Sequence, residues 1–379
     1  MKIKTITCHN VYNYGASLQA YALQHFLEEQ GHDVEIIDFQ PYFHQDRYNL
    51  FYIGKGYKYY NISAKYPFLK PFIAMISNRK MFQTYGRKKF FDKFTNTFLH
   101  LTTHRYETTE ELRKIPPTAD IYIAGSDQIW NTNCENGLEP AYYLDFGQQS
   151  IKRISYAASF AISEIQPEYK SFVSNQLQKF DKISVREQTG LDILTTLGIS
   201  DGHRVLDPVF LLTSEEWTIL TKNAHTHKLK SNKFIVVYDF LGDEKIAKLS
   251  KTLKNNFNLP IVSVNDACSR NYADININDA GPLEFLWLIK NAHTVIASSF
   301  HATAFSIIFN KDFYIYPLKG QSSSSRMIDL LGMLGLSERF LSEKPLNSID
   351  YSNVNRLIEN EIYNSKSFLI DSTTITTNY

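Results

Sequence analysis

Four segments of the chain carry polar residues directly after a stretch that reads as a buried strand. They are 9–16, 125–131, 186–187 and 298–303. In an open α/β sheet, ligands bind at the carboxyl ends of the strands, so chemistry is expected at these four places. Together they hold two histidines, an arginine, two carboxylates, several hydroxyls and amides, and a glycine that opens a helix.

The segments 186–187 and 298–303 have residues that can bind an anion. His301 opens a helix behind two serines, where the helix dipole favours negative charge and the imidazole can act as general acid or base. Arg186 lies at a strand-to-helix junction and can bind phosphate or carboxylate in a bidentate manner. The serines of 322–325 and Arg326 precede another helix and form a further candidate anion cradle. The structural alternatives are a buried histidine, a surface pair of Arg186 with Glu187, and an ordinary serine loop.

The earlier segments suit a sugar. Gly15 opens a helix and exposes backbone N–H groups to an anion or a sugar oxygen. Asp127 follows a strand and can bind hydroxyls or act as a base. The spacing around Gly15 is not GxGxxG, so a dinucleotide fingerprint is absent. The structural alternatives are a helix capped by Asn13 and a capped turn beside a core Trp130.

Composition excludes several classes of protein. The 40 Lys and Arg balance 39 Asp and Glu, which argues against a nucleic-acid binder that relies on overall basicity. The three scattered cysteines form no CxxC, so neither a disulfide scaffold nor a cysteine-ligated zinc organises the fold. No HExxH, GxSxG or P-loop is present, and no metal site is predicted. We find no secretory signal and no apolar run long enough to span a membrane, which predicts a cytoplasmic protein.

The elements that must position these residues alternate between strand and helix in two successive halves. The 379 residues also favour two domains. We predict two Rossmann-like domains, 1–212 and 213–340, facing across a cleft, then a C-terminal helix and polar tail over 341–379. The expected strands are 3–8, 34–39, 120–124, 151–157, 182–185, 205–212, 233–238, 260–264, 294–297 and 313–316. The expected helices are 16–30, 164–180, 187–197, 243–255, 283–290, 302–309, 327–334 and 354–363.

The first domain contains an insertion at 42–100 with an unusual composition. Between 51 and 100, ten Lys or Arg accompany a single acid, Asp92, and fourteen aromatic residues. One interpretation is an irregular insertion with an amphipathic helix near 81–98 that is solvated on its basic face. The other is a surface that meets anionic lipid or a phosphorylated acceptor.

An ordered series of motifs between residues 10 and 326 resembles the polysaccharide pyruvyl transferases. The motifs are Asn10-x-x-Asn13-x-Gly15-Ala16-x-Leu18-Gln19-Ala20-x-Ala22-Leu23, Gly125-Ser126-Asp127-Gln128-x-Trp130-Asn131, Ser155-Tyr156-Ala157-Ala158-Ser159, Ile183-Ser184-x-Arg186-Glu187, Leu206-Asp207-Pro208-x-Phe210, Ser299-Phe300-His301-Ala302 and Ser325-Arg326. The resemblance implies a fold similar to GT-B glycosyltransferases. It also implies transfer of pyruvate from phosphoenolpyruvate to two hydroxyls of a hexose, as a cyclic ketal, in capsule or exopolysaccharide biosynthesis.

The resemblance also implies roles for individual residues. The expected catalytic residues are His301 and Asp127; the expected donor-binding residues are Arg186, Ser299, Phe300, Ser325 and Arg326; the expected acceptor-binding residues are Asn13, Gly15, Ser126 and Gln128. No metal and no cofactor is implied, because phosphoenolpyruvate is a co-substrate. The implied partners are phosphoenolpyruvate and a hexose-containing glycan, with no nucleic acid. A lipid-linked acceptor would bring residues 51–100 to the inner face of the cytoplasmic membrane.

The chain departs from the family pattern at one position. The family commonly has Arg-x-His where this chain has Ser299-Phe300-His301. Either Arg326 or Arg186 supplies the missing charge, or the donor differs. The alternatives are therefore a GT-B-type glycosyltransferase that uses a nucleotide sugar, and a sugar-binding relative without activity.

Overall fold

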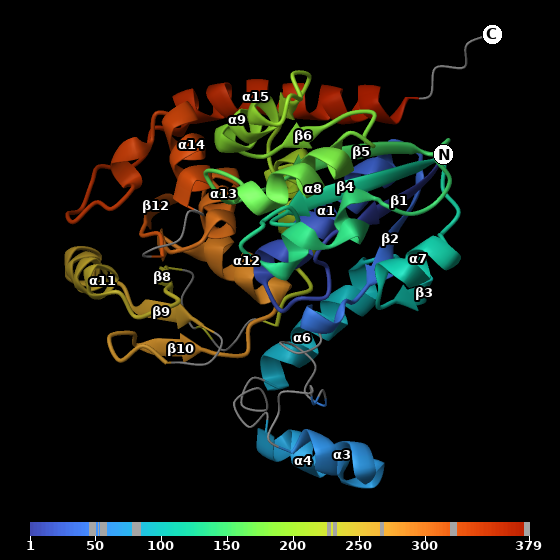
Figure 1. Ribbon diagram of the computed structural model, residues 1–379. Coiled ribbons are helices and arrows are strands. Elements are labelled where there is room, and N and C mark those ends of the chain that lie inside the picture. Colours follow the sequence, from blue (N-terminus) through green and yellow to red (C-terminus); the bar gives the residue numbers. More distant parts are fainter. Residues whose placement is uncertain are drawn as a thin grey trace.

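The computed structural model describes residues 1–44, 51, 53, 59–77, 85–225, 229, 233–265, 269–318 and 324–374. These residues form two α/β domains, each built on its own parallel sheet. The predicted fold class is therefore confirmed. Figure 1 shows the N-terminal sheet on one side of the molecule and the C-terminal sheet on the other, with helices around both.

The N-terminal sheet has seven strands in the order β3-β2-β1-β4-β5-β6-β7. Its strands are β1 (Lys2–Ile6), β2 (Asp33–Phe39), β3 (Leu101–Tyr106), β4 (Ile121–Asp127), β5 (Lys152–Ala158), β6 (Ser184–Val185) and β7 (His203–Arg204). The helices are α1 (Tyr14–Glu29), α3 (Tyr60–Lys65), α4 (Lys70–Ser77), α6 (Tyr85–Phe98), α7 (Thr109–Lys114), α8 (Pro167–Leu177), α9 (Gln188–Thr196) and α10 (Ser214–Thr221), with 3₁₀ turns η1 (Pro67–Leu69), η2 (Glu135–Leu138), η3 (Pro140–Tyr143) and η4 (Pro208–Leu211). The strand order reverses between β1 and β4, which is where an open α/β sheet binds ligands.

The C-terminal sheet has five strands in the order β10-β9-β8-β11-β12. Its strands are β8 (Ile235–Tyr238), β9 (Ile261–Val264), β10 (Ile275–Ile277), β11 (Thr294–Ala297) and β12 (Asp312–Ile315). The helices are α11 (Glu244–Phe257), α12 (Pro282–Asn291), α13 (Phe300–Ile308), α14 (Ser325–Met333) and α15 (Tyr351–Thr373), with the 3₁₀ turn η6 (Ser337–Arg339). Here the order reverses between β8 and β11, so α13 starts at the second switch point.

Aromatic packing joins the two domains. The ring of Tyr14, in the first turn of α1, stacks on Phe285 of α12 with centroids 4.4 Å apart. It also stacks on Phe91 of α6 and meets the edge of Tyr238 at the end of β8. One continuous hydrophobic core includes strands of both sheets. Because this contact is close-packed, the first turn of α1 is held directly against the C-terminal domain.

The C-terminal helix α15 returns to the N-terminal domain (Figure 1). The backbone N–H of Leu206 donates to Ser365 Oγ at 2.9 Å, and Arg204 pairs with Glu361 at 3.3 Å. The predicted helix at 354–363 covers only part of the first half of α15, which runs on to Thr373. The last residues of the predicted polar tail, 375–379, lie outside the described residues.

One predicted strand differs from the structure. The segment 205–212 is not a strand: Asp207 Oδ1 accepts a hydrogen bond from Val209 N at 3.1 Å, and Pro208 has no N–H for a ladder, so η4 forms instead. After residue 212, where the first predicted domain ends, the chain forms α10, whose capping box joins Thr213 to Glu216.

The insertion divides into two different parts. Helix α6 packs between the domains, with Phe91 and Phe94 buried and the guanidinium of Arg87 over the rings of Tyr14 and Phe91. Helices α3 and α4 project from the body (Figure 1) and share a small apolar cluster that includes Ile73 and Ala74. Residues 81–84 of the helix predicted near 81–98 lie outside the described part.

Candidate active site

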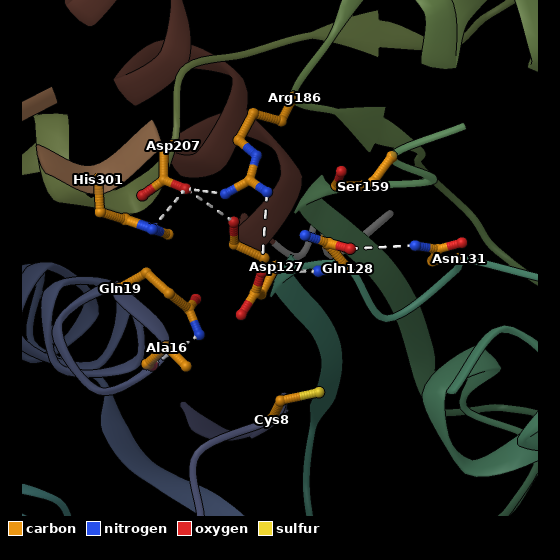
Figure 2. Close-up of polar contacts among 12 residues, drawn as sticks. Cys8, Ala16, Gln19, Asp127, Gln128, Asn131, Ser159, Arg186, Asp207 and His301 are labelled. Atoms are coloured by element: carbon orange, nitrogen blue, oxygen red, sulfur yellow. Dashed lines mark hydrogen bonds and ion pairs between the residues drawn. The ribbon is translucent and has the colours of Figure 1, made fainter. Parts of the chain in front are cut away.

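Three distant segments meet at one buried carboxylate. Asp207 begins η4, Arg186 follows β6, and His301 lies in the first turn of α13 (Figure 2). Arg186 Nη1 forms an ion pair with Asp207 Oδ2, and His301 Nε2 lies 3.4 Å from the same oxygen. Ser126 Oγ, from β4, donates to that oxygen at 3.3 Å. Both domains therefore contribute to a single charged network.

The network keeps Asp207 ionised. Burial alone would raise the pKa of Asp207, but the positive charges of His301 and Arg186 and the hydrogen bonds of the carboxylate hold that pKa well below its usual range. Burial opposes the charge of Arg186 as well, yet its pKa is raised because Asp207, Asp127 and Glu187 lie close to it. Asp207 thus fixes the orientation of an arginine and a histidine at once.

Two arginines lie over the same aromatic ring. The guanidinium carbons of Arg186 and Arg326 are 4.8 Å and 5.6 Å from the ring centroid of Phe300. Both arginines are buried, and burial together with the charge of Arg186 lowers the pKa of Arg326 to about 10. Among the described residues, Nε and Nη2 of Arg186 and Nε of Arg326 find no hydrogen-bond acceptor. Buried donors of this kind require an acceptor, so the pair is built to hold an anion.

His301 lies directly against the start of α1. A Cβ atom on Gly15 would come within 1.9 Å of His301 Nδ1, so only glycine lets the helix and the imidazole approach this closely. With Nε2 directed at Asp207, Nδ1 faces the first turn of α1. The structure thus brings the predicted acceptor-binding Gly15 into contact with the predicted catalytic His301.

Asp127 lies at the end of β4, beside the arginine. Its Oδ1 is 3.8 Å from Arg186 Nη2 and accepts a hydrogen bond from Gln128 N at 2.9 Å. Its backbone φ of 70° is in the left-handed region, which is uncommon for a residue with a side chain and is often found at functional sites. The Asp127 side chain is 18% exposed, compared with 0% for Asp207, so it is the carboxylate of this site that solvent reaches.

The comparison with protein families settles what kind of chain this is. Residues 13–317 match the family described as Polysaccharide pyruvyl transferase. The chain belongs to this family. No curated protein matches the chain.

Several solved structures are similar to this pyruvyl transferase family member over nearly the whole chain. A putative UDP-N-acetylglucosamine 2-epimerase from Listeria monocytogenes is 9% identical, with 99% of this chain and 91% of that chain covered and a TM-score of 0.49. The UDP-GlcNAc 2-epimerase of Methanocaldococcus jannaschii, in complex with UDP-GlcNAc and UDP, is 11% identical, with 98% and 99% covered and a TM-score of 0.49. The E. coli ADP-heptose lps heptosyltransferase II is 10% identical, with 97% and 100% covered and a TM-score of 0.39.

The remaining predicted residues of this family member lie at the margin of the network. Ser299 caps α13 by accepting from Ala302 N at 3.4 Å, and Asn13 caps α1 by accepting from Ala16 N at 3.2 Å. Gln128 accepts from Asn131 Nδ2 at 3.0 Å, and Ser325 is the first residue of α14. Residues 322 and 323 of the predicted serine cradle lie outside the described residues.

Sequence reasoning did not place two carboxylates in the site. One is Asp207; the other is Glu187, whose Oε1 accepts from Ser159 Oγ at 2.9 Å and from the N–H groups of Phe160 and Ala161. Glu187 thereby holds the turn after β5 beside Arg186. The sequence did offer one signal for Asp207, which is an aspartate inside the apolar run 205–212. A carboxylate that is buried with such a run needs a charged partner, and this need points to a site.

The space around the two arginines is small in this conformation. A cavity of about 20 Å³ lies between Arg186, Asp207, Phe300 and Arg326, which is room for about one water molecule. A larger anion therefore enters only if the cavity widens. Gln188 N donates to Asp329 Oδ2 at 3.0 Å, so α9 of one domain and α14 of the other are joined beside this cavity.

Among the described residues, one group could hold a metal ion: His25, Glu29 and Glu216. Glu216 already closes the capping box of α10, and none of the three touches the Asp207 network. No helix in the described part of the chain is long and apolar enough to cross a membrane.

Proposed function

We propose that this protein transfers pyruvate from phosphoenolpyruvate to two hydroxyls of a hexose in a glycan, forming a pyruvate ketal in capsule or exopolysaccharide biosynthesis. The observation that carries the proposal is the pair of buried arginines with unpaired N–H donors beside His301. Phosphoenolpyruvate has a phosphate and a carboxylate, and guanidinium groups bind both in a bidentate manner. Family membership supports the same class of reaction.

Arg326 supplies the donor charge that Ser299 lacks. Ser299 is occupied as the cap of α13, whereas Arg326 is buried beside Arg186 and over Phe300. Arg186 is already paired with Asp207, whereas Arg326 has no carboxylate partner among the described residues, and burial and the charge of Arg186 both oppose its positive charge. Binding of the donor therefore relieves an electrostatic cost that the free protein carries.

The reaction moves two protons: each acceptor hydroxyl loses one, and the methylene carbon and the phosphate each gain one. His301 gives a proton to the methylene carbon of phosphoenolpyruvate, and the resulting oxocarbenium carbon accepts the oxygen of the first sugar hydroxyl. The carbon–oxygen bond to phosphate then breaks with its electron pair leaving on the phosphate, and the second hydroxyl adds to the same carbon. One of the two hydroxyl protons returns to His301, which has given its own proton to the new methyl group. The other hydroxyl proton leaves with the phosphate.

Asp207 and Asp127 have different roles in the proposed reaction. Asp207 is a positioning residue, because it holds Nε2 of His301 and the guanidinium of Arg186. With Nε2 so held, Nδ1 carries the transferred proton and faces Gly15. Asp127, being partly exposed, is the base proposed for the acceptor hydroxyl, with Ser126, Gln128 and Asn13 on the same side.

The test is phosphoenolpyruvate-dependent phosphate release with a panel of hexose glycans, with a pyruvyl ketal confirmed on the acceptor by mass spectrometry. His301→Ala is expected to lower the rate by about 10²–10⁴-fold. Leu241→Ser, an exposed change in the C-terminal domain, is the control and leaves the rate unchanged. Thermal stabilisation by nucleoside diphosphates and not by phosphoenolpyruvate would instead support a nucleotide-sugar glycosyltransferase.

We further propose that α3 and α4 contact an anionic membrane surface, where a lipid-linked acceptor would be presented on the cytoplasmic face. Phe68, Phe72 and Ile76 lie at i, i+4 and i+8 and are 77%, 62% and 54% exposed. The opposite face of α4 packs Ile73 and Ala74 into the cluster of the projecting helices. A helix that is apolar on both faces needs a second surface that buries its exposed apolar face. Residues 59–77 contain lysines but no acid, so an anionic lipid surface fits this need best.

Co-sedimentation with vesicles tests this contact. Binding to phosphatidylglycerol-containing vesicles is expected to exceed binding to pure phosphatidylcholine, and Phe68→Ser with Phe72→Ser is expected to weaken it on the order of a hundredfold. Leu241→Ser, 72% exposed elsewhere, is the matched control. Equal binding by the double variant, or concentration-dependent self-association through these helices, would contradict the membrane contact.

A further inference from the structure

A second polar cavity lies beside the first loop of the N-terminal domain. Its volume is about 340 Å³, within the range of ligand pockets. It opens at the carboxyl ends of β1, β2 and β3 and is walled on one side by α6. None of the residues expected in the donor or acceptor site lines it. The residues that matter for the argument are Tyr12, Asp38, Lys88, Asp92, Asn96 and Arg105.

One wall is a pre-arranged carboxylate. Asp38 Oδ1 accepts from Gln40 Nε2 at 2.6 Å and lies 3.1 Å from Nε2 of the buried His9. Its Oδ2 accepts from Arg105 Nε at 3.3 Å. Burial would raise the pKa of Asp38, but His9, Gln40 and Arg105 together lower it. Asp38 is therefore an ionised acceptor held in one orientation before any ligand arrives.

The opposite wall is a second paired carboxylate on α6. Lys88 Nζ donates to Asp92 Oδ2 at 2.6 Å, and Tyr12 OH donates to Asp92 Oδ1 at 3.1 Å. Lys88 also hydrogen-bonds the Tyr12 hydroxyl and lies 5.0 Å above the Tyr12 ring. The Tyr12 ring and the amide of Asn96 complete a wall with both polar and aromatic surfaces.

The charges of this cavity cancel. The lining has two carboxylates, Asp38 and Asp92, and two cations, Arg105 and Lys88, and each charge is paired with a partner in its own wall. A phosphate would meet the carboxylates, and a divalent cation would meet the arginine and lysine. A neutral ligand rich in hydroxyls can both donate to the carboxylates and accept from the cations and amides. The lining therefore fits an uncharged saccharide.

The cavity and the proposed reaction centre share one loop. Asn10 and Tyr12 line the cavity, while Gly15, three residues further on, touches His301. Tyr12 and Tyr14 both contact Phe91 of α6, so the loop is held firmly between the two places. A glycan whose terminal hexose reaches His301 would carry its next sugar residue over this loop.

We propose that this cavity is a second sugar-binding subsite, which takes the neutral saccharide unit adjoining the hexose that is modified. The proposal rests on the proposed function for the identity of that hexose, but the binding itself requires no donor. It assigns α6, part of the insertion, to recognition of the acceptor. It also predicts that oligosaccharides bind better than single hexoses.

Direct binding tests the subsite without phosphoenolpyruvate. The purified full chain is titrated with neutral hexose mono-, di- and trisaccharides and with sulfated oligosaccharides of the same lengths. We expect neutral di- or trisaccharides to bind most tightly. Asn96→Ala with Arg105→Ala, both on the cavity wall, should weaken that binding about tenfold or more. Lys93→Ala with Thr97→Ala, on α6 but lining a different cavity, should not.

The outcomes separate this subsite from the reaction. Length-dependent binding that the wall variant loses and the His301→Ala variant keeps supports the subsite even if phosphoenolpyruvate is not the donor. No binding to any oligosaccharide, a preference for the sulfated series, or equal binding by the two double variants overturns it. If pyruvyl transfer is confirmed, an unchanged preference for longer acceptors in the wall variant overturns it as well.

Discussion

The two polar regions of this protein use charge in opposite ways. Around Phe300, two buried arginines keep N–H donors for which the described chain offers no acceptor. In the cavity beside Tyr12, each cation is already paired with a carboxylate. In the first region Arg186 is paired with Asp207, but Arg326 has no carboxylate partner among the described residues, which leaves a place for an added anion. In the second region the charges are already paired, which suits a neutral, hydroxyl-rich ligand.

The difference teaches how one fold separates donor from acceptor. Both regions lie at the carboxyl ends of strands, and the loop from Asn10 to Gly15 runs between them. A charged donor would be drawn to the unpaired arginines and would gain little from the paired cavity. An uncharged sugar would instead bind in the paired cavity and gain little from the unpaired arginine donors. With the proposed function, charge pairing as well as shape would separate the donor from the acceptor.

The largest expected effect is on the free energy of unfolding, when the buried ion pair of Arg186 and Asp207 is removed. Arg186→Ala leaves Asp207 buried without its main partner and should cost about 3–5 kcal/mol of unfolding free energy. Arg105→Ala removes an arginine whose side chain is 60% exposed and should cost under about 1 kcal/mol. Urea denaturation of both variants measures this, and equal losses would contradict the distinction.

A smaller effect is expected where the two regions meet. Gly15→Ala places a methyl group where His301 Nδ1 now lies, so the imidazole must move. Misplacement of a catalytic group by about 1 Å costs on the order of 10²-fold in rate. Turnover should fall by about that factor while oligosaccharide binding at the Tyr12 cavity persists.

The control for this substitution is Gly332→Ala, because nothing lies within 4 Å of an added Cβ there. Initial rates and glycan titrations on both variants provide the measurement. Full activity in Gly15→Ala would show that the close contact with His301 is unimportant.

The pH dependence of stability is expected to distinguish Asp207 from Asp38. The folded pKa of Asp207 is below its ordinary 3.8, so its contribution to stability is present above pH 3.8 and is lost as the pH falls below it. The unfolding free energy of the wild type should therefore fall more steeply between pH 4 and pH 2 than that of Asp207→Asn, by at most about 1.4 kcal/mol per pH unit.

Asp38 shifts in the same direction, but its side chain is 10% exposed and its arginine partner 60% exposed, compared with 0% for Asp207 and 1% for Arg186, so Asp38→Asn should change the slope less. Denaturant titrations at several pH values give both slopes. Identical slopes for wild type and Asp207→Asn would contradict the buried network.

Much of the fold follows from local sequence pattern. The strand at 294–297 and the helix opened by Asn13 are where the sequence predicts them, since burial and capping are local properties. The edge strands β7 and β10 escaped prediction because they have only two and three residues, and β3 escaped because Leu101–Tyr106 is largely polar. The length of α15 also escaped, because its half-buried face is defined by the N-terminal domain on which it packs.

The candidate site was predictable only in part. His301, Arg186 and Asp127 stand out because each follows a strand. Their common partner Asp207 does not, since its role depends on three segments that meet only in the folded chain. The Tyr12 cavity is likewise formed by residues from four elements with no shared motif.

The central claim is that the buried arginines form an anion site for phosphoenolpyruvate. A thermal-shift titration with phosphoenolpyruvate on the wild type, Arg326→Met and Arg105→Met tests it most directly. A ligand that binds only the folded state stabilises it by about 2.7 kcal/mol at a hundred times its Kd. We expect a saturable rise in Tm for the wild type and Arg105→Met and none for Arg326→Met, although Arg326→Met should be at least as stable without ligand. An equal rise in Arg326→Met, or no rise in the wild type, would contradict the claim.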